Sequence, residues 1–183
     1  MANISNKAIQ MPASAIRKLV PLADAAKKQG TKVYHLNIGQ PDIKSPKCAL
    51  DAIKNFSLEN VSYSHSAGLM ELRKGLVEKY YKKIGIDITV DELIVTVAGS
   101  ESVNLALEIA CNPGDEVIVL EPFYTNYNTF AFMNGLTLKA ISTDIKNGFQ
   151  VPPIEEFEKA ITDKTKAILV CNPGNPTGTL YSK

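Results

Sequence analysis

Cys171-Asn172-Pro173-Gly174-Asn175-Pro176-Thr177-Gly178 follows an apolar, β-branched run and contains two Asn-Pro steps. Proline fixes φ and restricts the residue before it to extended conformations, so this stretch predicts an ordered turn at the end of a strand. Such a turn can hold Asn175 in a defined position. At the carboxyl end of a strand in an α/β sheet, its amide can donate to a phenolate or carboxylate oxygen of a ligand. The alternative is a loop whose asparagines only bond local backbone.

Short apolar strands alternate with helical patterns from Glu92 onward. The segments are Leu93–Val97, Val103–Ala110, Val117–Leu120, Thr125–Met133, Leu136–Ile141, Ile154–Ile161 and Lys166–Val170. This βαβ order predicts an α/β domain of three layers, in which helices cover both faces of a mostly parallel sheet. The carboxyl ends of parallel strands meet at one edge, and ligand chemistry is expected there.

A different pattern precedes this domain. We expect residues 1–44 to form an N-terminal arm with a short strand, and residues 45–183 to form the first part of the large domain. The supporting segments are an amphipathic stretch over 16–25 ended by Gly30, a strand at 33–37, a helix over 45–56 and a helix over 69–84 closed by Gly85.

Composition excludes several classes of protein. With 183 residues, 45% of them hydrophobic, 21% charged, and a net charge of +1, the chain is neither disordered nor a nucleic-acid binder. No apolar run approaches the ~20 residues that span a bilayer, and residues 1–5 resemble no secretory signal, so we expect a cytoplasmic protein without membrane contact. The three cysteines are widely separated, and His35 and His65 lack partners at ligand spacing, so no metal site is expected.

Ala98-Gly99-Ser100-Glu101 connects a predicted strand to a predicted helix. The glycine permits close backbone approach, and the free amides of a helix N-terminus, with its partial positive charge, fit phosphate oxygens. The alternative is a plain N-cap formed by Ser100. The loop lacks the Gly-Lys-Ser/Thr of a P-loop and the three glycines of a dinucleotide site.

The next strand ends in Glu121-Pro122-Phe123-Tyr124, which places two aromatic side chains at the same edge of the sheet. An aromatic ring there can stack on a planar ligand and fix its plane. The alternative is that Phe123 and Tyr124 only close the top of the core.

Motifs in a fixed order carry a family resemblance. They are Asn37-Ile38-Gly39-Gln40-Pro41-Asp42, Tyr63 with Ala67-Gly68-Leu69 and Leu72-Arg73, Ala98-Gly99-Ser100-Glu101, Pro113-Gly114-Asp115-Glu116-Val117 with Glu121-Pro122-Phe123-Tyr124, and Asn172-Pro173 with Asn175-Pro176-Thr177-Gly178. Over essentially its whole length the chain resembles the N-terminal half of a class I/II aminotransferase. These are fold-type I pyridoxal-phosphate (PLP) enzymes of the aspartate aminotransferase superfamily. The resemblance implies the large domain of that fold, incomplete in this chain.

The resemblance also implies a cofactor site for pyridoxal 5'-phosphate. By match to the family motifs, Gly99, Ser100 and Glu101 would hold the phosphate. Tyr124 would stack on the pyridine ring, and Asn175 would donate to its phenolate oxygen. Tyr124 and Asn175 would also border the substrate.

Three further positions follow from the same resemblance. Gly39 matches the position whose backbone lies against the substrate carboxylate, the alternative being an ordinary turn. Tyr63 matches a tyrosine that reaches the partner subunit's cofactor phosphate, which implies a homodimer; the alternative is a buried loop aromatic. Arg73 lies in a Leu-Arg helical motif, for which we expect a structural ion pair.

The implied function of the full-length parent is transfer of an amino group between an amino acid and a 2-oxo acid, as in amino-acid metabolism. We assign no catalytic residue to this chain. The Schiff-base lysine and the carboxylate that keeps the pyridine nitrogen protonated are expected beyond residue 183, and Lys183 is not that lysine, so the fragment alone should be inactive. Alternatives are a C–S β-lyase or other fold-type I PLP enzyme, and a non-catalytic phosphate-binding or dimerisation module.

Overall fold

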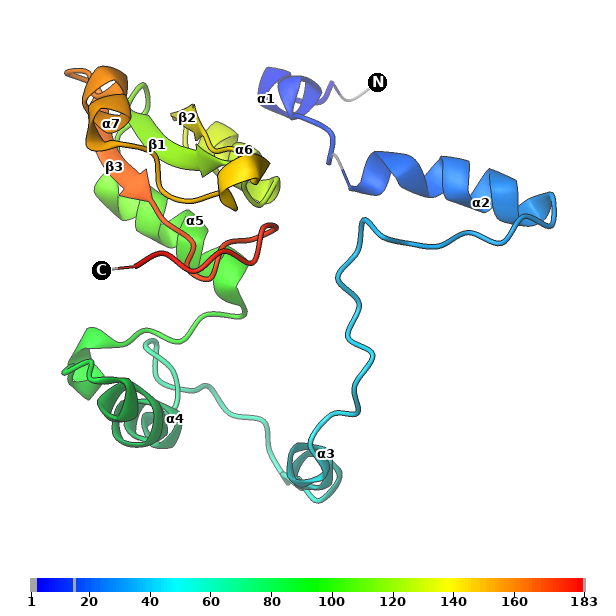
Figure 1. The fold of residues 1–183 in the computed structure, drawn as a ribbon. Helices are drawn as coiled ribbons and strands as arrows, with labels where there is room; N and C mark the ends of the chain where they lie inside the picture. Colours follow the sequence, from blue (N-terminus) through cyan, green and yellow to red (C-terminus); the bar gives the residue numbers. More distant parts are fainter. Residues whose placement is uncertain (1–2, 15, 183) are drawn as a thin grey trace. The chain divides into compact units, whose positions relative to one another are not determined.

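The computed structural model describes residues 3–14 and 16–182, so the predictions that involve residues 1–2 and Lys183 lie outside the described part. Residue contacts divide the chain into two compact units (Figure 1). One unit contains the residues up to Ile38 and those from Ser102 onward, and the other is Gly39–Glu101. The predicted division into 1–44 and 45–183 stays a prediction. Each unit is described by itself.

The first unit is built on a parallel sheet of three strands. They are β1 (Glu116–Glu121), β2 (Thr137–Ser142) and β3 (Thr165–Leu169). The order is β2-β1-β3, with β1 in the centre and both of its pairings parallel. Val117 pairs with Leu138 on one side and with Ala167 on the other. The strands predicted after residue 110 are therefore confirmed, within one or two residues.

Seven helical segments belong to this unit among the described residues. They are α1 (Asn6–Gln10), η1 (Arg17–Leu19), α2 (Val20–Lys28), α5 (Gly99–Ala110), α6 (Asn126–Met133), η5 (Ile145–Asn147) and α7 (Ile154–Ala160). The first turn of α5 groups with the other unit. Helices were predicted where α2, α5, α6 and α7 occur, because their apolar residues recur at helical spacing.

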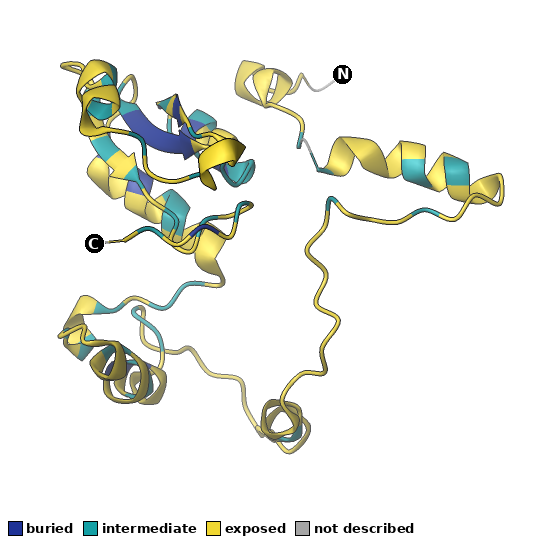
Figure 2. Cartoon of the chain, in the orientation of Figure 1, coloured by how far each residue is buried: buried dark blue, intermediate teal, exposed yellow. Residues whose placement is uncertain are grey.

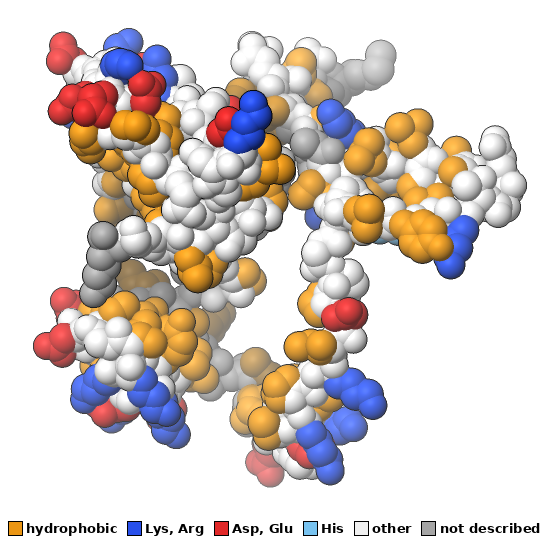
Figure 3. Space-filling model, viewed as in Figure 1, with side chains coloured by type: hydrophobic (Ala, Val, Ile, Leu, Met, Phe, Trp, Pro, Cys, Tyr) orange, Lys and Arg blue, Asp and Glu red, His pale blue; other side chains and the backbone are white. Residues whose placement is uncertain are grey.

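The central strand β1 carries the core (Figure 2). Successive side chains of a strand point to opposite faces. Val117 packs with residues of α5 and α6, whereas Ile118 and Leu120 pack with residues of α7. Helices therefore cover both faces, which gives the three-layer α/β/α arrangement expected from the sequence. The outer side of α7 is charged and solvated (Figure 3), and Lys159 pairs there with Glu156 at 2.6 Å.

The second unit is helical and carries few buried side chains. Its elements are α3 (Lys47–Lys54), α4 (Met70–Leu76), the π-helical turn η2 (Val77–Tyr81), η3 (Lys82–Ile84) and η4 (Val90–Glu92). The continuous run from α4 to η3 ends at Gly85, as predicted, with Gly85 in the left-handed conformation. Arg73 and Val77 are its buried residues among those described.

Two predicted strands are wrong. Neither Val33–Asn37 nor Leu93–Val97 forms a strand. A strand needs a neighbour that supplies a ladder of hydrogen bonds. The Val95 amide of the second segment donates to the Ala67 carbonyl at 3.0 Å, but no described strand pairs with this segment, and the first segment makes no backbone hydrogen bond outside itself among the described residues. Apolar β-branched residues favour strand formation, but a strand forms only where a partner strand pairs with it.

Candidate functional site

Two segments of the first unit meet where β1 and β3 end. The Pro122-Phe123-Tyr124-Thr125 segment links β1 to α6, and the Asn-Pro stretch 171–178 follows β3. Because β1 and β3 are parallel neighbours, both segments leave the sheet at its carboxyl edge. Phe123 and Asn175 line the same small cavity. The structure thus brings together the two predicted loops that follow these strands.

Tyr124 is held by its hydroxyl and by its ring. The Nδ2 of Asn126 donates to the Tyr124 hydroxyl over 2.7 Å. The rings of Tyr124 and Tyr127 meet edge to face, with centroids 5.5 Å apart and planes at 89°. This geometry suits the quadrupoles of aromatic rings. The half-buried Tyr124 therefore has a defined ring plane, which stacking on a planar ligand requires.

The Asn-Pro stretch is braced by its own hydrogen bonds. Asn172 Oδ1 accepts from the Tyr181 amide at 3.1 Å, and the Gly174 amide donates to the Thr179 carbonyl at 2.8 Å. The buried Thr179 hydroxyl donates to the Gly148 carbonyl at 2.9 Å. The ordered turn predicted from the proline spacing is present, because these bonds fix the backbone on both sides of Asn175.

The two asparagines of this stretch differ in what they bond. Asn172 bonds the backbone of Tyr181, as the alternative interpretation of the loop supposed. The Asn175 side chain is exposed and has no hydrogen-bond partner among residues 3–14 and 16–182. A braced loop that presents a free amide is what a ligand donor requires, so the local-backbone interpretation does not account for Asn175.

Tyr127 is buried, at 7% exposure, next to these groups. Its ring stacks on Phe123, with centroids 6.1 Å apart and planes at 14°. Burial, followed by a hydrogen bond to the Cys171 thiol, raises the pKa of Tyr127 to about 12. Cys171 Sγ in turn donates to the Pro173 carbonyl at 3.3 Å. Tyr127 therefore stays neutral and joins the two loops.

Gly99, Ser100 and Glu101 form the first turn of α5. The Glu101 carboxylate accepts from the Val97 amide at 2.6 Å, and the Glu101 amide donates to the Ala98 carbonyl at 3.0 Å. The Glu101 side chain thus ties the first turn of the helix to the segment that precedes it. The amides of the first turn have no acceptor within their own helix. In this turn the backbone amides of Gly99 and Ser100 are therefore the groups suited to bind an anion.

A Cβ placed on Gly99 or on Gly39 would meet nothing within 4 Å, so neither glycine is required by packing in this chain. Tyr63 is fully exposed in an irregular stretch between α3 and α4, which makes the alternative of a buried loop aromatic wrong. The predicted ligand contacts of these residues stay predictions.

The expected ion pair of Arg73 is wrong. Arg73 is 3% exposed, and its Nη1 donates to the Val90 carbonyl at 2.7 Å. No carboxylate pairs with it within the described residues, and its Nε has no partner there. The sequence could not show that a backbone carbonyl, rather than an acid, faces the guanidinium.

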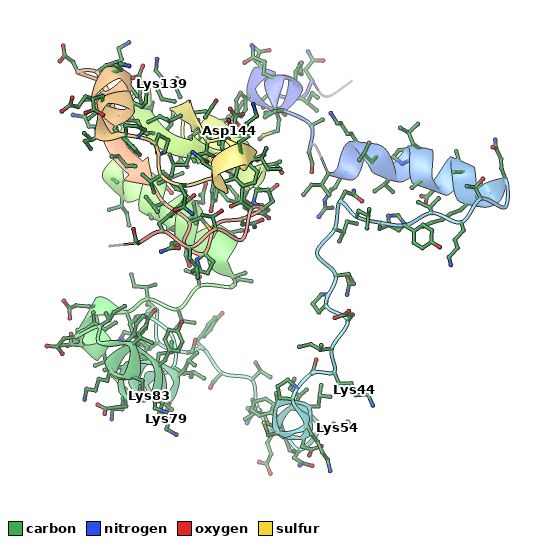
Figure 4. The ribbon with its side chains drawn as sticks, viewed as in Figure 1. Lys44, Lys54, Lys79, Lys83, Lys139 and Asp144 are labelled. Atoms are coloured by element: carbon green, nitrogen blue, oxygen red, sulfur yellow. The ribbon has the colours of Figure 1, made fainter. Side chains whose placement is uncertain are left out.

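Among the described residues, no lysine lines the cavity beside Asn175. Lys44, Lys54, Lys79 and Lys83 are exposed on the second unit (Figure 4). Within the described ranges, no group of three or more His, Cys, Asp or Glu residues is placed to hold a metal. None of the helices described there has the length and hydrophobicity of a transmembrane span.

Comparison with known proteins identifies the family. The sequence pattern of the family described as "Aminotransferase class I and II" matches residues 31–183. The chain belongs to this family. It is 34% identical over 184 residues to the aspartate/prephenate aminotransferase of Thermus thermophilus, covering 100% of this chain and 48% of that protein. It is 32% identical over 181 residues to the (5-formylfuran-3-yl)methyl phosphate transaminase of Methanocaldococcus jannaschii, covering 98% and 46%.

Solved aminotransferase structures share the fold. The chain matches the alanine aminotransferase from Pyrococcus furiosus with a TM-score of 0.87 and 39% identity, covering 99% of this chain and 47% of that one. The chain therefore spans about half the length of the relatives it matches. These matches confirm the predicted family and the predicted fold class of this aminotransferase chain.

Sequence reasoning assigned no function to Tyr127 or Cys171. One signal was available for Tyr127, since it lies three residues after Tyr124 at the start of a helix, where side chains at this spacing become neighbours. No comparable signal marks Cys171, because its neighbours come from another strand and helix.

Proposed function

We propose that the whole protein containing this chain is a PLP-dependent aminotransferase that moves an amino group between an amino acid and a 2-oxo acid. The observation that carries the proposal is the free amide of Asn175, which a braced loop presents at the same edge of the sheet as the segment that carries the fixed ring of Tyr124. Family membership adds the class of reaction.

The residues present fit pyridoxal phosphate. The Asn175 amide can donate to the ring oxygen, Tyr124 can stack on the ring, and the amides of Gly99 and Ser100 can bind the phosphate. When bound, PLP supplies an electron sink for the negative charge that develops as a substrate amino acid loses its α-proton. A Cβ at Gly99 meets only open space, which leaves room for close approach of a phosphate.

Each of these side chains has a separate task. Tyr124 sets the plane of the ring, because Asn126 and Tyr127 already fix its own orientation. Asn175 stabilises the deprotonated phenolate oxygen with a hydrogen bond and so lowers the pKa of that oxygen. In our proposal Glu101 belongs to the turn that holds the phosphate, and the bond of its carboxylate to the Val97 amide keeps this first turn of α5 in place.

Substrate and subunit contacts complete the proposal. We propose that the Gly39 backbone lies against the substrate carboxylate and that the exposed Tyr63 reaches the cofactor phosphate of a partner subunit in a homodimer. The lysine that binds the cofactor covalently is expected outside residues 1–183. The matched relatives are named for different substrates, so we do not assign the amino-acid substrate.

Absorption spectroscopy of the whole protein tests the function. We expect it to bind one PLP per subunit and, when mixed with a panel of amino acids, to convert the bound cofactor to its aminated form. Addition of a 2-oxo acid should then restore the first spectrum. Release of ammonia and a thiol from C–S substrates, without this exchange, would favour a β-lyase. Absence of PLP binding would favour a non-catalytic module.

A further inference from the structure

Tyr127 contacts both segments that carry the proposed cofactor ligands. Its ring meets the Tyr124 ring at 5.5 Å. Tyr127 and Cys171, which starts the Asn-Pro stretch, line the same cavity, and a hydrogen bond from the Tyr127 hydroxyl to the thiol is, after burial, a cause of the raised pKa of Tyr127. Tyr127 and Asn175 also line the same cavity. One buried side chain thus links the ring that would stack on the cofactor to the loop that would bind its oxygen.

The bond to Cys171 continues into the turn. Cys171 Sγ donates to the Pro173 carbonyl at 3.3 Å, and Pro173 precedes Asn175 by two residues. The neighbouring Gly174 amide is fixed by the Thr179 carbonyl. If the Tyr127 hydroxyl moved, the Cys171 thiol and the Pro173 backbone, which lies just before Asn175, would therefore move with it.

Tyr127 is a buried residue that lies outside the two clusters packed on the faces of the sheet. Its ring contacts are Phe123 and Tyr124. Burying a hydroxyl is unfavourable unless it is hydrogen-bonded, and phenylalanine would fill the same space without that requirement. The hydroxyl therefore calls for an explanation beyond packing.

We propose that Tyr127 is a positioning residue for the cofactor site: its ring sets the orientation of Tyr124, and its hydroxyl, through Cys171, sets the position of the loop that carries Asn175. This inference rests on the proposed function. In this proposal Tyr127 does not touch the reacting atoms. It affects cofactor binding only through the positions of Tyr124 and Asn175.

Variants of the whole protein test the inference. Tyr127→Phe keeps the ring and removes the hydroxyl, whereas Cys171→Ala removes the thiol that receives it. We expect each to weaken PLP affinity about two- to tenfold, the range of one hydrogen bond, and to shift the pH dependence of the cofactor's visible absorption in the same direction. The double variant should differ little from either single variant, because both break one connection. Cys171→Ser, which keeps a donor and acceptor, should restore most of the affinity.

Phe157→Leu is the matched control, since Phe157 packs against the cluster on the α7 face. It should lower the melting temperature without changing the absorption spectrum. If PLP binds and Asn175→Ala shifts the spectrum while Tyr127→Phe and Cys171→Ala change only the melting temperature, Tyr127 is structural and the inference fails alone. If the whole protein binds no PLP, the proposed function fails and the inference with it.

Discussion

Asn172 is joined to Tyr181 by two hydrogen bonds: its Oδ1 accepts from the Tyr181 amide at 3.1 Å, and its Nδ2 donates to the Tyr181 carbonyl at 3.5 Å. Three residues later, the Asn175 side chain bonds no described residue. The same dipeptide, Asn-Pro, therefore has a structural function at one position and leaves its amide available at the other.

This contrast gives a paired prediction. In the whole protein, Asn172→Ala should lower the free energy of unfolding by about 1 kcal/mol, because it removes the bonds to Tyr181. Asn175→Ala should leave stability nearly unchanged but shift the visible absorption of bound PLP and its pH dependence, because the phenolate loses a donor. Chemical denaturation and absorption titration measure the two effects. An unchanged spectrum in Asn175→Ala would remove that residue from the site.

Gly68 is predicted to be essential to the fold of the second unit. Its φ is +94°, and a Cβ there would lie 2.5 Å from the Cβ of Val95. Gly68→Ala should therefore destabilise by about 2 kcal/mol or more, through both backbone strain and overlap.

Gly75 provides the control for Gly68. It lies within α4, and an added Cβ would meet nothing within 4 Å. Gly75→Ala should raise stability by roughly 0.5–1 kcal/mol, because alanine loses less backbone entropy in a helix. Thermal unfolding of both variants compares them directly. Equal effects of the two substitutions would contradict the close approach of Gly68 to Val95.

The sequence predicted the parts of the fold that depend on local pattern. β1 to β3 and the helices around them follow from short apolar runs and helical spacing, both of which are properties of neighbouring residues. The segments 33–37 and 93–97 have equally suitable residues, but strand formation depends on a partner elsewhere in the chain. A local sequence pattern does not show whether a distant segment will pair with a strand.

The same distinction applies to the site. Asn175 and Tyr124 could be predicted because each follows a strand, and strand ends define the ligand edge of an α/β sheet. Tyr127 and Cys171 lie far apart in the sequence, so no spacing rule indicates the bond between them. The Val90 carbonyl that bonds Arg73 is a backbone group, so a pattern of side chains likewise could not predict it.

Tyr127 should make stability depend on alkaline pH. In the folded chain its pKa is raised from 10.0 to about 12, chiefly by burial. The unfolded chain therefore releases this proton at lower pH than the folded chain does. The contribution of neutral Tyr127 to stability is complete below pH 10 and is lost as the pH rises toward 12.

Urea unfolding of the whole protein across this window measures the effect. Because other groups also titrate there, the informative quantity is the difference in unfolding free energy between the unmodified protein and Tyr127→Phe. We expect this difference to move in favour of the variant as the pH rises. A difference that does not change with pH would mean that the Tyr127 hydroxyl ionises alike in both states.

Gly99→Val tests the phosphate position at the start of α5. A side chain at Gly99 meets no atom of the chain within 4 Å, so folding should change by less than about 1 kcal/mol, the cost of ordinary helix propensities. PLP affinity should fall by tenfold or more, because a branched side chain would occupy the space through which a phosphate approaches the backbone amides. Titration with inorganic phosphate and with PLP, next to thermal unfolding, separates the two effects. Since valine also leaves the bond between Glu101 and Val97 intact, unaltered affinity would mean that this helix end binds no anion.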